Sequence, residues 1–171
     1  KYGTSTNLKA LLTLLNSKLL NYYYVKKFKS TKKVFSEIQA RTVAQLPIAN
    51  FVEYETKLTS SATTLIDRNI KLSDLSTHFQ KVVTNEYYIG KWQRKLNKWW
   101  RLDFTDFTKA LKIEVSLQQK DELLSLFEKY KTQCAEIDYK IQETDHEIDQ
   151  LVYKLYKLTS EEIAIIEKEG N

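Results

Sequence analysis

The 171-residue sequence contains no methionine, one proline, one cysteine and three glycines. So few glycine and proline residues favour a mostly helical chain. The single cysteine, Cys134, excludes an internal disulfide framework and agrees with a reducing compartment, so we expect a cytoplasmic protein. No run approaches the roughly 20 apolar residues of a membrane span, and no signal peptide is visible, so we expect no membrane partner. Because the chain begins with Lys1 and lacks methionine, we expect it to be a piece of a longer protein.

The same scarcity excludes several kinds of enzyme site. The glycines are too far apart for a phosphate-binding loop or a dinucleotide fingerprint. His78 and His146 each lack a second His or Cys at metal-ligand spacing, and His146 with Asp145 and Asp149 is interpreted as a solvated helix face. Glu136, Asp138 and Lys140 have the residue types of a metal-dependent nuclease. On a helix, residues two apart point in different directions, so we interpret this run as surface charge and expect neither a catalytic nor a metal site.

Apolar residues recur at alternating steps of four and three along residues 123–158. A spacing that averages about 3.5 residues keeps one apolar seam facing a partner helix, as in a coiled coil. Ser116 and Gln119 have capping-box spacing, so we expect the helix to begin there. Cys134 lies on the seam and is expected to be a small buried hydrophobic residue. The seam positions are Leu123, Phe127, Tyr130, Cys134, Ile137, Ile141, Thr144, Ile148, Leu151, Leu155 and Leu158.

A second seam of the same spacing lies upstream, with Ser61 and Arg68 as its weak points. Its positions are Phe51, Tyr54, Leu58, Ser61, Leu65, Arg68, Leu72, Leu75, Phe79 and Val82. An antiparallel hairpin lets each seam bury itself on the other. We therefore predict a mainly all-α fold, a small helical part over 1–48 followed by a long coiled-coil hairpin. The hairpin would comprise helices over 49–83 and 116–158, a tip over 84–115 and a short C-terminal helix over 159–169. The alternative is that one or both long helices pair with another chain.

Charge is distributed unevenly along the chain, whose net charge is +5. Residues 1–50 carry nine Lys or Arg against one acidic residue, and residues 84–101 carry five against one. Residues 116–169 carry seven Lys against thirteen Asp or Glu. Two basic regions joined by a neutral-to-acidic part indicate a polyanionic partner met at particular places. The alternative is that lysines only keep a helical surface soluble.

The N-terminal region reads as a helix followed by a basic loop. Residues 7–28 are predicted to form one helix, with Asn7 or Thr6 as its cap. Its predicted apolar face comprises Leu8, Leu11, Leu12, Leu15, Leu19 and Tyr22 or Tyr23. The loop KKFKSTKK, residues 26–33, suits phosphate binding with a stacking Phe28, and a solvated loop with a buried Phe28 is the alternative. Val34 and Phe35 could make a short strand, and Pro47 ends the unit.

All three tryptophans fall within nine residues, among basic side chains. If residues 91–101 are helical, Trp92 and Trp99 share one face, while Arg94, Lys98 and Arg101 share another. This arrangement suits clamping a duplex backbone. A small aromatic core that closes the hairpin is the alternative, and we favour it for Trp92 and Trp99. Asp103 and Asp106 have helix-start spacing and are expected to complement the helix macrodipole.

Three stretches of the chain have recognisable motifs. The first is NLKALLTLLNSKLLNYYYVKKFKS with VFSEIQARTVAQLPI, within residues 7–48. The others are KWQRKLNKWWRLDFTDFTKAL, residues 91–111, and EIDQLVYKLYKLTSEEIAIIEKE, residues 147–169. Together they resemble the C-terminal region of bacterial adenine-specific DNA methyltransferases and type IIG restriction-modification enzymes, with their TaqI-like specificity domain. Lys157 stands where the family often has Gly, so we expect the helix to run on before Thr159. Thr159 and Glu162 are then expected to cap the final helix.

The resemblance implies DNA target recognition or positioning by a fragment that is not itself an enzyme. The chain lacks the Gly-rich turn that binds S-adenosylmethionine, and with Pro47 alone it lacks an Asn-Pro-Pro-Tyr motif. Methylation with S-adenosylmethionine, and cleavage with Mg²⁺ if the parent is type IIG, would belong to other domains, and we expect no cofactor in this chain. The implied partners are double-stranded DNA and the parent's methyltransferase domain. The alternative is an interaction module, docking on the parent or forming a homodimer through its seams, that does not contact DNA.

Two sets of residues are the candidates for DNA contact. The first patch would bind phosphates, with Gln39 reading an adenine edge through its amide. The first patch comprises Lys26, Lys27, Lys29, Lys32, Lys33 and Arg41. The second patch comprises Arg94, Lys95, Lys98 and Arg101.

Overall fold

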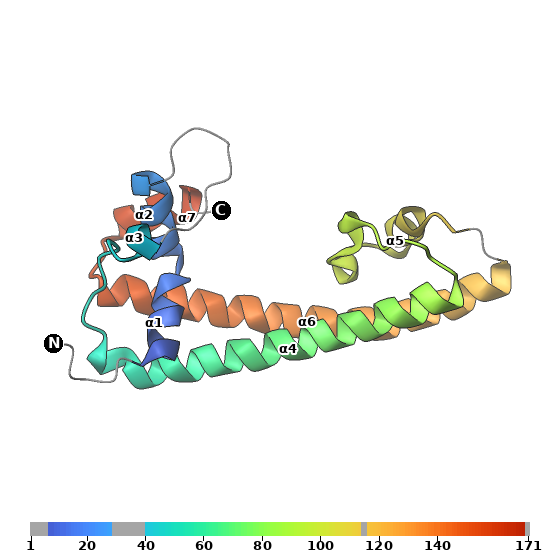
Figure 1. The fold of residues 1–171 in the computed structure, drawn as a ribbon, viewed down its shortest axis with the longest axis horizontal. Coiled ribbons are helices and arrows are strands. Elements are labelled where there is room, and N and C mark those ends of the chain that lie inside the picture. The colour runs from blue at the N-terminus through green and yellow to red at the C-terminus, as the bar shows by residue number, and fades with distance from the viewer. Residues whose placement is uncertain (1–6, 29–39, 114–115, 170–171) are drawn as a thin grey trace. The chain divides into compact units, whose positions relative to one another are not determined.

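The computed structural model is α-helical, and it describes residues 7–28, 40–113 and 116–169. No strand occurs in these ranges, which confirms the mainly all-α prediction (Figure 1). The α-helices are α1 (Leu8–Leu15), α2 (Lys18–Phe28), α3 (Ala40–Val43), α4 (Glu55–Glu86), α5 (Phe104–Leu111), α6 (Leu117–Leu155) and α7 (Ser160–Glu169). Short 3₁₀ turns cover Val52–Tyr54, Arg94–Leu96 and Trp99–Arg101. Among the described residues, no helix is both long and apolar enough to cross a membrane.

The chain divides into two compact units, which are described separately. The terminal unit comprises Lys1–Leu65 and Glu143–Asn171, and the middle unit comprises Ile66–Gln142. The helices α4 and α6 contribute to both units. In the middle unit, Arg68 donates to the Lys140 carbonyl at 2.6 Å, and Tyr87 donates to the Gln119 carbonyl at 3.1 Å. The later residue of α4 thus pairs with the earlier residue of α6, so the two helices run antiparallel in this unit.

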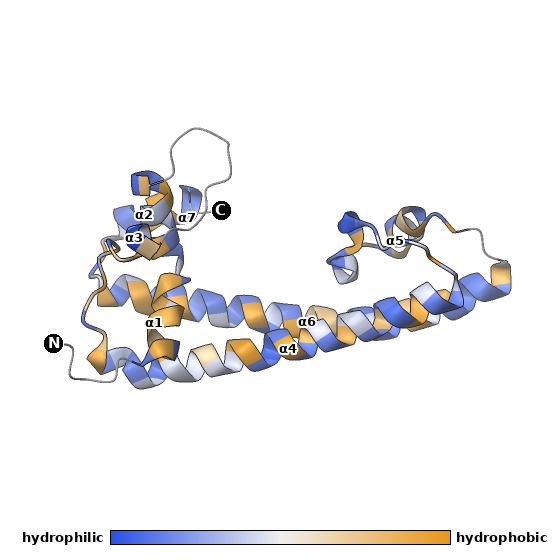
Figure 2. Cartoon of the chain, in the orientation of Figure 1, coloured by the Kyte–Doolittle hydropathy of each residue, from blue (hydrophilic) through white to orange (hydrophobic). Residues whose placement is uncertain are grey.

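The predicted seam of α6 is confirmed. Each of its positions from Leu123 to Leu158 is buried or half-buried, including Thr144. Hydrophobic residues accordingly recur along α6 among hydrophilic ones (Figure 2). The capping box also forms, because Gln119 accepts from the Ser116 amide at 2.9 Å and donates its own amide to Ser116 Oγ at 3.3 Å. Cys134 is fully buried, and burial raises the pKa of its thiol to about 11.

The seam of α4 follows the prediction less closely. Leu58, Leu72 and Phe79 are buried as expected. At the other end of the helix Val83 is fully buried and Val82 only half-buried. At the first weak point, Ala62 is buried and Ser61 is half-buried. The seam is thus shifted by one residue at these places.

The prediction of one continuous helix over residues 7–28 is wrong. The chain breaks between α1 and α2, where the Ser17 hydroxyl donates to the Leu14 carbonyl at 2.7 Å. Asn7 does cap α1, accepting from the Lys9 amide at 3.1 Å. The predicted apolar face is wrong at two positions, because Leu8 is 76% exposed and Leu12 is 47% exposed. Its other members are half-buried, and Leu15 and Leu19 pack against the core. The buried residues of these two helices and their junction are instead Ala10, Thr13, Leu14, Ser17 and Leu20.

Contacts with α4 explain which face of α1 is buried. The Thr13 hydroxyl donates to the Leu58 carbonyl at 3.2 Å, and Lys9 Nζ donates to Thr63 Oγ1 at 3.0 Å. Ala10 and Leu14 belong to the same hydrophobic core cluster as Leu58. Small residues at positions 10 and 13 therefore face α4, while two leucines of α1, Leu8 and Leu12, face outward.

The expectation that α6 runs on towards Thr159 is also wrong. The helix ends at Leu155, and Lys157 adopts a left-handed backbone with φ 55°. The Leu158 amide donates to the Tyr153 carbonyl at 3.1 Å, which closes the helix end in the manner of a Schellman motif. Thr159 and Glu162 then cap α7 as predicted, with hydrogen bonds of 2.8 and 3.3 Å.

Candidate nucleic-acid interface

A buried carboxylate of α6 caps α2 in the terminal unit. Asp149 is 4% exposed, and its Oδ1 accepts from the backbone N–H of Lys18 at 2.8 Å. Burial raises the pKa of Asp149, and the hydrogen bond and charge of Lys18 oppose that rise. The interpretation of this residue as part of a solvated helix face is therefore wrong. A backbone amide in the first turn of a helix has no hydrogen-bond acceptor within that helix. Asp149, which is distant in sequence, provides the acceptor for the Lys18 amide.

Further polar contacts join α2 to α7. Lys18 Nζ lies 2.6 Å from Glu167 Oε2, and the buried Tyr153 donates its hydroxyl to Glu167 Oε1 at 2.8 Å. The Lys18 ammonium lowers the pKa of Glu167, while burial raises the pKa of Tyr153. Lys26 Nζ lies 2.5 Å from Glu169 Oε2, and this hydrogen bond raises the pKa of Lys26. The acidic helix α7 thus compensates part of the positive charge of α2.

The first predicted patch is described only in part. Lys26 and Lys27 are exposed on the last turn of α2, and Arg41 is exposed on α3. Lys27 Nζ donates to Tyr23 Oη at 2.7 Å and lies 5.1 Å from the centroid of that ring. The remaining predicted positions, Lys29, Lys32, Lys33 and Gln39, lie outside the described residues, as do Val34 and Phe35. The described part therefore presents basic groups beside aromatic rings, and its DNA contacts stay a prediction.

An aromatic core holds the segment between α4 and α6 in the middle unit. Trp99 is fully buried and stacks on Phe79 with 3.8 Å between ring centroids, while Phe107 lies 4.7 Å from Phe127. Trp99 Nε1 also donates to Ser76 Oγ at 3.1 Å. This confirms the aromatic core favoured for Trp99. Residues 91–101 do not form the continuous helix that the two-face arrangement required, because the segment contains only two short 3₁₀ turns, Arg94–Leu96 and Trp99–Arg101.

Asp138 fixes the second turn of this segment to α6. Its Oδ2 accepts from Trp100 Nε1 at 3.2 Å and from Arg101 Nε at 2.7 Å. It is half-buried, so its interpretation as plain surface charge is wrong, whereas Glu136 and Lys140 form an exposed pair at 2.6 Å. Asp103 caps α5 by accepting from the Asp106 amide at 2.7 Å.

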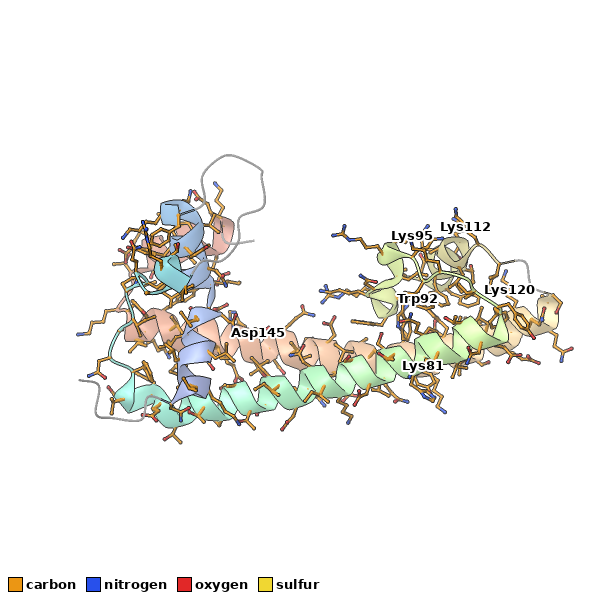
Figure 3. All side chains as sticks on the ribbon, in the orientation of Figure 1. Lys81, Trp92, Lys95, Lys112, Lys120 and Asp145 are labelled. Carbon is orange, nitrogen blue, oxygen red and sulfur yellow. The ribbon has the colours of Figure 1, made fainter. Side chains whose placement is uncertain are left out.

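The second predicted patch is exposed over this core. Arg94, Lys95 and Lys98 are exposed on or next to the 3₁₀ turns, and Arg101 is exposed while bonded to Asp138. Figure 3 shows Lys95 and Lys112 on the segment that carries α5. The segment's apolar residues turn inward, with Leu96 1% exposed and Trp100 7% exposed. A buried aromatic base beneath exposed cations can hold those cations in place for an anionic ligand. DNA binding by these four residues stays a prediction.

Among the described residues, no group of three or more metal-ligating side chains lies together. Sequence patterns gave no sign that Asp149, Tyr153 and Asp138 are anchoring residues. Each one bonds to a partner 14 or more residues away. Local spacing carries no signal for such pairs.

Comparison with known families gives two matches. Residues 52–152, more than half of the chain, match DUF8810, a domain of unknown function. The chain belongs to this family. Residues 1–48 match the TaqI-like C-terminal specificity domain, which supports a restriction-modification specificity domain with a role in DNA sequence specificity. No curated protein and no solved structure matches the chain.

Proposed function

We propose that this chain recognises and positions DNA for an adenine-specific methyltransferase of a restriction-modification system, with a type IIG enzyme as the parent. The observation that carries this proposal is the match of residues 1–48 to a specificity domain. The helix α2 of that segment ends in the exposed cations Lys26 and Lys27. Methyl transfer with S-adenosylmethionine, and cleavage with Mg²⁺, would take place in other domains of the parent protein.

The proposed contacts divide between positioning and readout. Lys26, Lys27 and Arg41 would bind phosphates, which supplies affinity for any duplex sequence. Glu169 already pairs with Lys26, so a phosphate there competes with a carboxylate of this chain. Gln39 remains our candidate for reading an adenine edge.

The second patch would act as an additional clamp on the phosphate backbone. Arg94, Lys95 and Lys98 are exposed, and the buried residues of the same segment include the apolar Leu96 and the aromatic Trp99. Asp138 orients the guanidinium of Arg101 through two bonds of 2.6 and 2.7 Å, and Arg101 is the fourth proposed contact. Cations held on a packed core lose less conformational freedom on binding than cations on a mobile segment.

Binding to a duplex across a salt series tests this proposal. In the triple variant of Lys26→Gln, Lys27→Gln and Arg41→Gln, we expect weaker binding to every duplex sequence. The dependence of log affinity on log salt concentration should also flatten, by up to about 0.9 for each phosphate that the variant no longer neutralises. A matched control neutralises Lys57, Lys81 and Lys154, three exposed lysines on α4 and α6. Equal affinity and slope in the patch variant and the wild type would contradict the proposal.

A second candidate function is docking or dimerisation through the long helices without DNA contact. Two isoleucines of α4 favour it, because Ile66 is 40% exposed and Ile70 is 55% exposed in the middle unit. Ile70 lines a groove with Leu75, His78 and Tyr130. Light scattering over a concentration series separates the candidates. A stable dimer that dissociates in an Ile66→Asp, Ile70→Asp variant supports intermolecular pairing, and a monomer at every concentration contradicts homodimerisation.

A further inference from the structure

A tyrosine at the end of α4 has an unusual backbone and an exposed side chain. Tyr88 has φ 51°, in the left-handed region that favours glycine, and its side chain is 94% exposed. The Ile89 amide donates to the Thr84 carbonyl at 3.0 Å, so Tyr88 occupies the position in a helix-ending motif where glycine is most common. The ring makes little contact with the fold, so folding does not explain a tyrosine at a strained position. Lys112 and Lys157 have the same left-handed backbone, with φ 57° and 55°, but Tyr88 is the one of the three that presents an aromatic ring to solvent.

A polar groove adjoins this tyrosine. Its lining includes Tyr87, Tyr88, Lys91, Lys112, Gln119 and the acidic Glu86. Tyr87 is fixed by its hydrogen bond to the Gln119 carbonyl at 3.1 Å, so one wall of the groove is held in place. Lys91 and Lys112 are both exposed, and neither forms an ion pair with another residue that the structure describes. The groove thus offers one free aromatic face and two ammonium groups.

We propose that this groove binds an unpaired nucleotide of single-stranded DNA, with the base stacked on Tyr88 and phosphates on Lys91 and Lys112. An exposed aromatic ring beside cations is the usual platform for a single strand, because every base has a face that can stack. In a duplex, both faces of most bases are already covered by neighbouring base pairs, so Tyr88 selects unpaired bases. The polar lining suits a nucleotide better than a lipid chain or an apolar peptide.

This inference goes beyond the proposed duplex recognition and uses none of its residues. Lys91 and Lys112 are the cations that line the groove beside this ring, whereas the proposed duplex contacts are not part of its lining. The two proposals therefore predict different responses to the same substitutions, which makes them separable by experiment.

The test measures fluorescence anisotropy of a labelled oligothymidine single strand, and of a duplex of equal length, with the full chain. Tyr88→Gly is the decisive variant, because glycine adopts φ 51° without strain and the fold should be at least as stable as the wild type. We expect Tyr88→Gly to weaken single-strand binding about tenfold, with unchanged duplex binding. Tyr88→Phe keeps the stacking face and should bind like the wild type.

Two further variants complete the test. Tyr139→Ala removes a 62% exposed tyrosine from α6 of the same unit and should leave single-strand affinity unchanged. The double variant Lys91→Gln, Lys112→Gln should flatten the salt dependence by up to about 1.4 in log units, or about 0.7 for each phosphate contact.

The inference is overturned if Tyr88→Gly binds the single strand as the wild type does, if Tyr139→Ala loses as much affinity, or if no single strand binds at low salt. Duplex binding without single-strand binding overturns this inference and leaves the proposed function standing. Single-strand binding that depends on Tyr88, without duplex binding, supports this inference and contradicts the proposed function.

Discussion

The two units attach their short helices to the long ones by different kinds of interaction. In the terminal unit, a hydrophobic core that includes Leu20 joins α2 to α6, and three carboxylates add to it: those of Asp149, Glu167 and Glu169. In the middle unit, the segment that carries α5 is held mainly by stacked rings around Trp99, with Asp138 as its one carboxylate anchor among the described contacts. Ring packing depends little on pH or salt, whereas ion pairs and buried carboxylates depend on both. With three such carboxylates against one, the terminal unit should respond more strongly to pH and salt than the middle unit.

The difference also separates the two proposed DNA-binding patches. Lys26 of the first patch forms an ion pair with Glu169, so a phosphate that binds Lys26 must displace this carboxylate. In the second patch Asp138 binds Arg101, while Arg94, Lys95 and Lys98 remain exposed over a packed core. The Lys26–Glu169 pair is exposed and contributes little stability, so replacing Glu169 by a phosphate costs little free energy. We expect the second patch to be the more preorganised of the two.

Trp99→Ala should have the largest effect. Trp99 is fully buried and contacts Phe79, Phe107 and Phe127, so its removal leaves a large cavity in the middle unit. We expect a loss of about 3–5 kcal/mol in the free energy of unfolding, measured by urea titration, with little change between about pH 4 and 7. Trp92→Ala is the control, because Trp92 is half-buried and should cost less. Equal losses in the two variants would mean that Trp99 is not the centre of this core.

Asp149→Ala should have an intermediate effect and act on the terminal unit. The substitution leaves the Lys18 amide without its acceptor at the beginning of α2. We expect a loss of about 1–2 kcal/mol at neutral pH, and a smaller loss for Asp149→Asn, which keeps an oxygen acceptor. Asp145→Ala, a change on the exposed side of the same helix, should stay within about 0.5 kcal/mol. If the Ala and Asn variants lose equally, the capping bond is not what stabilises this joint.

The same residues give the terminal unit its expected pH dependence. Burial raises the pKa of Asp149, so this carboxyl stabilises the fold below its ordinary pKa, and that contribution is lost as the pH rises through the raised value. Glu167 has the opposite sign, because Lys18 lowers its pKa and its contribution is lost as the pH falls through the lowered value. The stability of Asp149→Asn relative to the wild type should therefore rise with pH. A constant difference across the range would contradict this assignment.

Features that repeat along the chain, or that depend on neighbouring residues, could be predicted from the sequence. The apolar seam of α6 and the capping boxes at Ser116 and Thr159 all follow from the spacing of residues a few positions apart. Their physical cause is local, because a helix places residues three and four apart on one face.

Features that depend on distant partners were not predictable in this way. Leu8 and Leu12 were predicted to lie on the apolar face, yet they are exposed, and contacts with Leu58 of α4 bury Ala10 and Thr13. Asp149 reads as surface charge until its bond to Lys18, 131 residues away, is known. For the candidate interface, the basic character of both patches was predictable, whereas the anchoring by Asp138 and the exposed Tyr88 were not.

Lys157→Gly should have the smallest effect, and it raises stability. Lys157 has φ 55° at the end of α6, where the Leu158 amide already closes the helix on the Tyr153 carbonyl. Glycine relieves the left-handed strain but adds freedom to the unfolded chain, so we expect a gain of about 0.5–1 kcal/mol. Lys154→Gly removes the same charge from the last turn of α6 and should cost up to about 1 kcal/mol, which gives a control of opposite sign. A loss in both variants would mean that the Lys157 side chain contributes more to the terminal unit than its backbone strain costs.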